Sequence, residues 1–198
     1  MSGAKRRSDA PGVLVELRLP AIQLQQGVDR YLYVFGVDGK ELPRFATISR
    51  VHRDDDRQMQ GYQRPEVQSH IAEIRRYIES PGAMIPNALV VAFDERVRFE
   101  VSTEDGGGTV GYARAGTLVI PIDEHLPDEE KPGWIVDGQQ RTLALSKSKR
   151  KDIPVPISAF VADDIQLQRD QFLRVNNQRP LPRGLLTELL PEVTAPLP

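Results

Sequence analysis

The sequence contains no cysteine, and this absence excludes disulfide bonds, thiolate nucleophiles and cysteine metal sites together. No run approaches the roughly 18 apolar residues that a membrane-spanning helix needs, so we expect no membrane association. The Gly-x-x-x-x-Gly-Lys-Ser/Thr motif is also missing, which argues against a P-loop ATPase but leaves other nucleotide sites open. Any chemistry must therefore depend on oxygen and nitrogen groups.

A strong excess of one charge is lacking as well, because the 198 residues carry a net charge of -2. An attraction of the whole chain to nucleic acid is not supported, and any such contact must be local. The 39% hydrophobic and 27% charged content is ordinary for a globular protein with one good core. The N-terminal stretch MSGAKRRSDAPG lacks the apolar segment of a signal peptide, so we expect a cytoplasmic protein with a flexible lead over residues 1–12.

The first half of the chain predicts two strands and one helix. VLVELRLPAIQL (13–24) alternates as a strand does, and RYLYVFGVDGKEL predicts a second strand that ends in a turn at residues 37–40. PEVQSHIAEIRRYIES (65–80) begins with proline, and its apolar residues recur at spacings of four, three and four. This pattern predicts an amphipathic helix that ends at the following proline and glycine.

The second half alternates between strand and helix. IPNALVVAFDE (85–95) predicts a buried strand, and residues 96–123 predict two strands around a Gly-Gly-Gly tip, which we interpret as an inserted β-hairpin. GWIV (133–136) and IPVPISAFVADD (153–164) predict further strands, and IQLQRDQFLRVNN (165–177) predicts a helix.

This alternation predicts a compact α/β (α+β) domain with a mixed sheet, an inserted hairpin and flanking helices. We expect a single domain over residues 13–191, followed by a tail over residues 192–198.

The motif Asp137-Gly138-Gln139-Gln140-Arg141 lies between the strand at 133–136 and a helix. The first N–H groups of a helix lack intrahelical partners and attract phosphate. Gly138 would let a phosphate approach, the two glutamine amides can donate hydrogen bonds, and the fork of Arg141 suits phosphoryl oxygens. Asp137 would cap the helix or hold a metal ion. The motif predicts a phosphate site, with a merely capped turn as the alternative.

The order of three motifs resembles that of a known family. VDGQQR followed by TLALS, with YQRPEVQSHIAEIRRYI before it and FLRVNNQRPLPRGLLTELL after it, resembles the DGQHR-domain family, including DndB-like and DpdB-like proteins of bacterial DNA-modification systems. Gln140 stands where the family name has histidine, so no imidazole is present there for proton transfer. A more distant similarity links the motif to the ParB and sulfiredoxin superfamily.

The resemblance implies a ParB/sulfiredoxin-like domain that binds ATP with Mg²⁺ and hydrolyses it in support of DNA modification. The modification is either 7-deazaguanine insertion or phosphorothioation, and the implied partners are DNA and a modification enzyme such as a base-exchange transglycosylase. Asp137, Gln140 and Arg141 would be catalytic, with Asp137 as the metal ligand. The nucleotide would be held by the motif and two flanking segments: Gly138, Gln139, Gln140, Arg141, Gln63, Arg64, Asn177 and Arg179.

Several of these residues have an equally simple structural explanation. Arg64 could be a surface residue that leads into a helix, and Asn177 could be a helix C-cap. The carboxylates at residues 54–56 could bind Mg²⁺ or form a solvated acidic loop. The basic run Lys147 to Lys151 could contact DNA or could complement a helix dipole.

Two other classes of function stay open at this point. One is a non-catalytic DNA-binding or regulatory module, which would bind DNA with strong salt dependence and need no nucleotide. The other is a metal-dependent nuclease of the ParB-like kind, which would nick plasmid DNA. A homo-oligomer is compatible with either.

Overall fold

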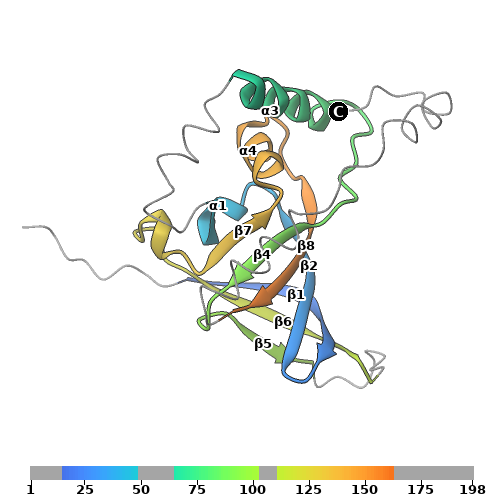
Figure 1. The fold of residues 1–198 in the computed structure, drawn as a ribbon, viewed down its shortest axis with the longest axis vertical. Coiled ribbons are helices and arrows are strands. Elements are labelled where there is room, and N and C mark those ends of the chain that lie inside the picture. The colour runs from blue at the N-terminus through green and yellow to red at the C-terminus, as the bar shows by residue number, and fades with distance from the viewer. Residues whose placement is uncertain (1–14, 49–64, 103–110, 163–198) are drawn as a thin grey trace, which may run out of the picture.

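The structure is a computed structural model, and it describes residues 15–48, 65–102 and 111–162. Eight strands form one mixed sheet in the order β3-β7-β4-β8-β2-β1-β6-β5 (Figure 1). The pairs β3/β7 and β4/β8 are parallel, and the other pairs are antiparallel. The strands are β1 (Val15–Gly27), β2 (Arg30–Asp38), β3 (Ala46–Thr47), β4 (Leu89–Phe93), β5 (Arg98–Val101), β6 (Ala113–Ile122), β7 (Gly133–Asp137) and β8 (Pro154–Val161).

The described helices are α1 (Leu42–Phe45), α3 (Pro65–Ile78) and α4 (Gln139–Lys147), with one 3-10 turn, η1 (Asp128–Glu130). Two of the helices, α3 and α4, pack against each other at one end of the molecule, and α1 contacts β3 and β6 (Figure 1). The predicted α+β class with a mixed sheet is therefore confirmed. No helix among the described residues is both long enough and apolar enough to cross a membrane.

One half of the sheet curls on itself. The rings of Tyr33 on β2 and Phe99 on β5 lie 5.5 Å apart between centroids, although β1 and β6 separate the two strands in the sheet. Gly116 on β6 permits this curl, because a Cβ atom there would lie 2.5 Å from the Phe99 ring and 2.3 Å from the carbonyl oxygen of Glu100. The main core takes buried side chains from both the curled half and the other half of the sheet, among them Phe35 on β2, Ile120 on β6 and Phe93 on β4.

The strands follow the alternation of the sequence. On β2, Tyr33, Phe35 and Val37 are buried, and Val34 and Gly36 between them are exposed. Because successive side chains of a strand point to opposite faces, this pattern fixes which face of β2 meets the core.

The predicted strands at 85–95, 133–136 and 153–164 are observed as β4, β7 and β8. The predicted hairpin is observed as the antiparallel pair β5/β6, which is the edge of the sheet. Residues 103–110, between these two strands, lie outside the described residues.

The helix predicted over 65–80 is observed as α3, with its apolar stripe against the core. Ile71 and Ile78 on this stripe are 2% and 1% exposed, and Val67 and Ile74 pack beside them. The helix predicted over 165–177 lies outside the described residues.

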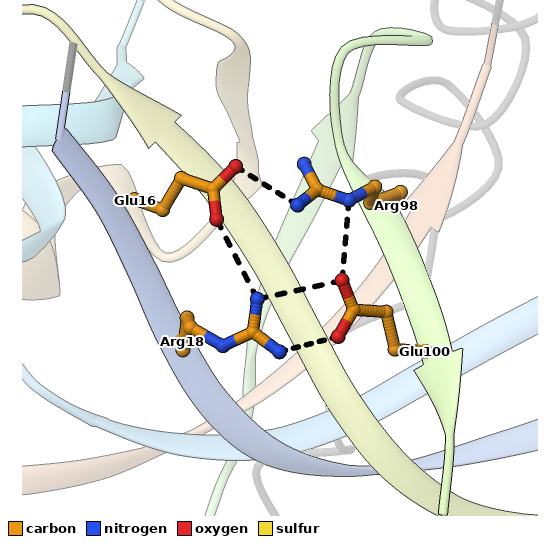
Figure 2. Close-up of polar contacts among 4 residues, drawn as sticks. All are labelled: Glu16, Arg18, Arg98 and Glu100. Carbon is orange, nitrogen blue, oxygen red and sulfur yellow. Dashed lines mark hydrogen bonds and ion pairs between the residues drawn. The ribbon is translucent and has the colours of Figure 1, made fainter.

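The outer face of the curled half carries four ion-paired side chains (Figure 2). Arg98 Nη2 lies 2.8 Å from Glu16, and Arg98 Nε lies 3.3 Å from Glu100. Arg18 pairs with both carboxylates, at 3.5 Å from Glu16. Val119 on β6 is in register with both arginines and is fully buried. The four charged groups therefore tie β1 to β5 across β6 and shield Val119.

Candidate functional site

The motif Asp137 to Arg141 lies at the carboxyl end of β7 and at the start of α4, as the sequence predicts. Gly138 joins the two elements with a φ of 91°, a left-handed conformation that favours glycine. A Cβ atom at this position would lie 2.2 Å from Cδ2 of Leu89, a fully buried residue of β4. Both the backbone conformation and the packing therefore require glycine here.

Arg141 ties the turn to the segment that precedes β4. Its Nη1 donates a hydrogen bond to the carbonyl of Asn87 at 2.6 Å, and its Nη2 donates to Ala88 at 3.4 Å. Nη2 also pairs with the Asp137 carboxylate at 3.1 Å. In this structure Arg141 therefore organises the protein itself, and its contact with phosphate stays a prediction.

The interpretation of Asp137 as a helix cap is wrong. The N-cap of α4 is Gly138, without a side-chain capping bond, and the Asp137 carboxylate turns to Arg141 instead. The i, i+4 spacing of these two residues brings their charges together across the first turn. Whether Asp137 also binds a metal ion stays a prediction. The described residues contain no group of three or more His, Asp or Glu side chains that could hold a metal ion.

The two glutamines of the motif differ in their surroundings. The Gln139 side chain folds back and donates to the carbonyls of Val136 at 2.9 Å and Ile135 at 3.3 Å. The Gln140 side chain makes no hydrogen bond within the described part of the chain, and it lines a pocket. Gln140 is thus the motif side chain that can receive a ligand without breaking a contact.

The pocket has a volume of about 690 Å³, within the range of small-molecule sites. One side is the motif, and the other is formed by α3 and the segment before β4. The lining residues outside the motif are His70, Ile74, Tyr77, Ile78, Met84, Ile85, Pro86 and Asn87.

Two contacts hold the pocket wall formed by residues 84–88. The Tyr77 hydroxyl on α3 donates to the carbonyl of Met84 at 2.9 Å and accepts from its N–H at 3.1 Å. At the far end, Arg141 holds the carbonyls of Asn87 and Ala88. The wall is therefore anchored to α3 at one end and to α4 at the other.

The polar end of the pocket is the N-terminus of α4. The first intrahelical hydrogen bond joins the Thr142 N–H to the carbonyl of Gly138 at 2.8 Å. The N–H groups of residues 139–141 precede this bond and have no partner within the helix. They lie at the positive end of the helix dipole, equivalent to about half a unit charge. This end of the pocket therefore suits an anion.

The comparison with protein families covers most of the chain. Residues 19–188 match the family DndB, which is described as DNA-sulfur modification-associated. The chain belongs to the DndB family. Membership confirms the predicted resemblance and connects the chain with DNA sulfur modification, that is, phosphorothioation. No curated protein and no solved structure matches the chain. The ParB and sulfiredoxin similarity and 7-deazaguanine insertion stay predictions.

The remaining predicted site residues fall outside the described residues: Gln63, Arg64, Asn177 and Arg179.

Sequence reasoning missed the wall of the pocket on α3. His70 and Tyr77 lie seven residues apart on α3, on the same side of the helix as Ile74 at the margin of the apolar stripe. A histidine and a tyrosine at this spacing next to the core stripe were the signal that α3 has a second contact surface.

Proposed function

We propose that this DndB-family chain binds ATP in the pocket between α3 and α4 and hydrolyses it as a component of a DNA sulfur modification system. The observation that carries the proposal is the two-ended character of the pocket. One end offers the N–H groups at the start of α4, and the other offers the apolar side chains of Ile74, Ile85 and Pro86. A nucleotide has the same two-part chemistry, with phosphates at one end and a flat base at the other.

In this proposal the phosphates lie against the first turn of α4. The N–H groups of residues 139–141 would donate to phosphoryl oxygens, as helix N-termini do at many phosphate sites. The Gln140 amide, which has no other partner in the described chain, would bind the terminal phosphate and orient the attacking water. Phosphoryl transfer needs mainly such positioning and charge stabilisation.

The Asp137–Arg141 pair supports the proposal that ATP binds together with Mg²⁺. A phosphate that draws Arg141 away leaves the Asp137 carboxylate unpaired beside a second negative charge. One carboxylate together with phosphate oxygens is a donor set that suits Mg²⁺. Mg²⁺, when bound, would neutralise charge on the phosphoryl oxygens.

The proposal is best tested at Gln140, because Arg141→Ala would also remove three hydrogen bonds within the protein. Gln140→Glu adds one negative charge where the phosphates would lie. Gln26→Glu is the matched control, since Gln26 is exposed next to the last residue of β1, and the turn between β1 and β2 lies at the opposite end of the molecule from α4 (Figure 1). ATP binding would be measured by calorimetric titration, and turnover by phosphate release, both with Mg²⁺.

We expect Gln140→Glu to weaken ATP binding at least tenfold, a change of about 1.4 kcal/mol. The melting temperature should stay unchanged, and Gln26→Glu should bind as the native protein does. Equal ATP affinity in native protein and Gln140→Glu would contradict the proposed site. Binding without phosphate release would retain the site but refute hydrolysis by the isolated chain.

A further inference from the structure

The basic side chains of the described chain fall into two groups. In the first group each cation pairs with a carboxylate: Arg18, Arg44, Arg96, Arg98, Lys131 and Arg141. The second group forms no ion pair within the described chain. Arg30 and Arg114 of this group lie on the curled half of the sheet, and the others gather where α3 and α4 end.

We call Lys40, Lys147, Lys149, Arg150 and Lys151 the basic end. They lie around the loop that joins α4 to β8, and hydrogen bonds hold two of their side chains in place. Lys40 Nζ donates to the carbonyl of Ser148 at 2.6 Å, and Arg150 Nη1 donates to Ile78 at the end of α3 at 3.3 Å.

The backbone of this loop is held as well. The Lys149 N–H donates to the Glu79 carboxylate at 2.8 Å, and the Arg150 N–H donates to Oγ of the buried Ser148 at 3.2 Å. Glu79 thus lies against this loop, and Asp152 follows Lys151 in the chain, but within the described residues neither carboxylate forms an ion pair with a cation of the basic end. Two of the five basic side chains are therefore held by hydrogen bonds, and none of the five forms an ion pair within the described chain.

The dipole of α4 does not explain this cluster. Its effect falls off within the last turn of a helix, and α4 ends at Lys147 with Ser148 as C-cap. Lys149 and Lys151 lie beyond the helix and are exposed. Like charges gathered at one end of the molecule repel one another, and a polyanion would relieve this repulsion.

We infer that the basic end contacts the phosphate backbone of duplex DNA, at the other end of α4 from the pocket. Phosphate contacts by lysine and arginine are independent of sequence and need no apolar centre. Protein interfaces are poor in lysine and rich in aromatic residues, and the basic end has the opposite composition. The DNA association of the family supports DNA as the polyanion. This inference does not depend on ATP binding.

The test compares two double variants of the full chain with the same loss of charge. K149Q/K151Q removes two charges from the basic end without removing a side-chain hydrogen bond of the structure. R30Q/R114Q removes two unpaired charges from the curled half of the sheet. Binding of a fluorescently labelled DNA duplex would be measured by anisotropy at several salt concentrations, after the melting temperature confirms folding.

We expect K149Q/K151Q to bind more weakly and to lower the slope of log affinity against log salt by about 2, since each phosphate contact contributes about 0.9. R30Q/R114Q should keep the native slope. Absence of duplex binding by the native chain, or equal slopes in both variants, would overturn the inference. It would also be overturned if polyglutamate bound to the basic end and DNA did not, because the surface would then fit an acidic protein.

Discussion

Replacing Gly138 with alanine should destabilise the protein through two separate effects. The left-handed conformation of this residue costs an alanine about 1–2 kcal/mol. The new methyl group would also lie 2.2 Å from Cδ2 of the buried Leu89, and overpacking of this kind costs about 1–3 kcal/mol. We therefore expect the free energy of unfolding to fall by about 2–5 kcal/mol in total.

Gly82→Ala is the control that separates the two effects. Gly82 has a φ of 79°, but no atom lies within 4 Å of the position of its Cβ. This variant should lose only the conformational part, about 1–2 kcal/mol. Both variants lower the entropy of the unfolded chain by the same substitution, so this contribution cancels in the comparison.

The assay is urea unfolding followed by circular dichroism, with the slope of the transition compared among variants. Leu89→Ala in each background completes the test, because removal of Cδ2 removes the clash. The loss in free energy of unfolding caused by Leu89→Ala should be smaller in the Gly138→Ala background than in the native one, by at least about 1 kcal/mol. Equal destabilisation by Gly138→Ala and Gly82→Ala, with additive effects of Leu89→Ala, would refute the packing argument.

Three further predictions concern charge and the pocket wall. Hydrogen bonding to Arg18 lowers the pKa of Glu100, so the ionised carboxylate stabilises the folded protein near neutral pH. The native protein should therefore be more stable than Glu100→Gln at neutral pH, and this difference should vanish as the pH falls through the pKa of Glu100. Urea unfolding of both proteins at several pH values checks this. Arg141→Lys should increase proteolysis in the segment before β4, measured by mass spectrometry, because lysine cannot reproduce the fork; an unchanged cleavage pattern would contradict this. Tyr77→Phe should lower the free energy of unfolding by about 1 kcal/mol and weaken ATP binding, because the hydroxyl no longer holds the backbone of Met84. Unchanged ATP affinity in a titration would show that this wall takes no part in binding.

The parts of the fold that depend on local signals could be predicted from the sequence. The spacing of the apolar residues predicts α3, because one helical face must meet the core. A strand followed by Asp-Gly and a helical pattern predicts the position of the motif. The four residues of α1, in contrast, are too few to show any periodicity, although Leu42 and Phe45 are fully buried.

The details of the site could not be predicted because they depend on contacts between distant segments. Arg141 donates to carbonyls more than fifty residues earlier in the chain. The residues next to it in the sequence do not distinguish this structural role from that of a phosphate-binding arginine. The approach of Leu89 to Gly138 likewise requires β4 and β7 to be neighbours. The curl that brings Tyr33 to Phe99 depends on the order of four strands.

The most direct test of the central claim is the amide NMR spectrum of the native protein during titration with ATP and Mg²⁺. If the phosphates bind at the start of α4, the largest shifts should occur at the N–H groups of Gln139, Gln140 and Arg141, with smaller shifts in the wall at residues 84–88. Adenosine alone should shift the wall and leave the first turn of α4 unchanged. Shifts confined to other parts of the protein, or no shifts at millimolar ATP, would contradict the account.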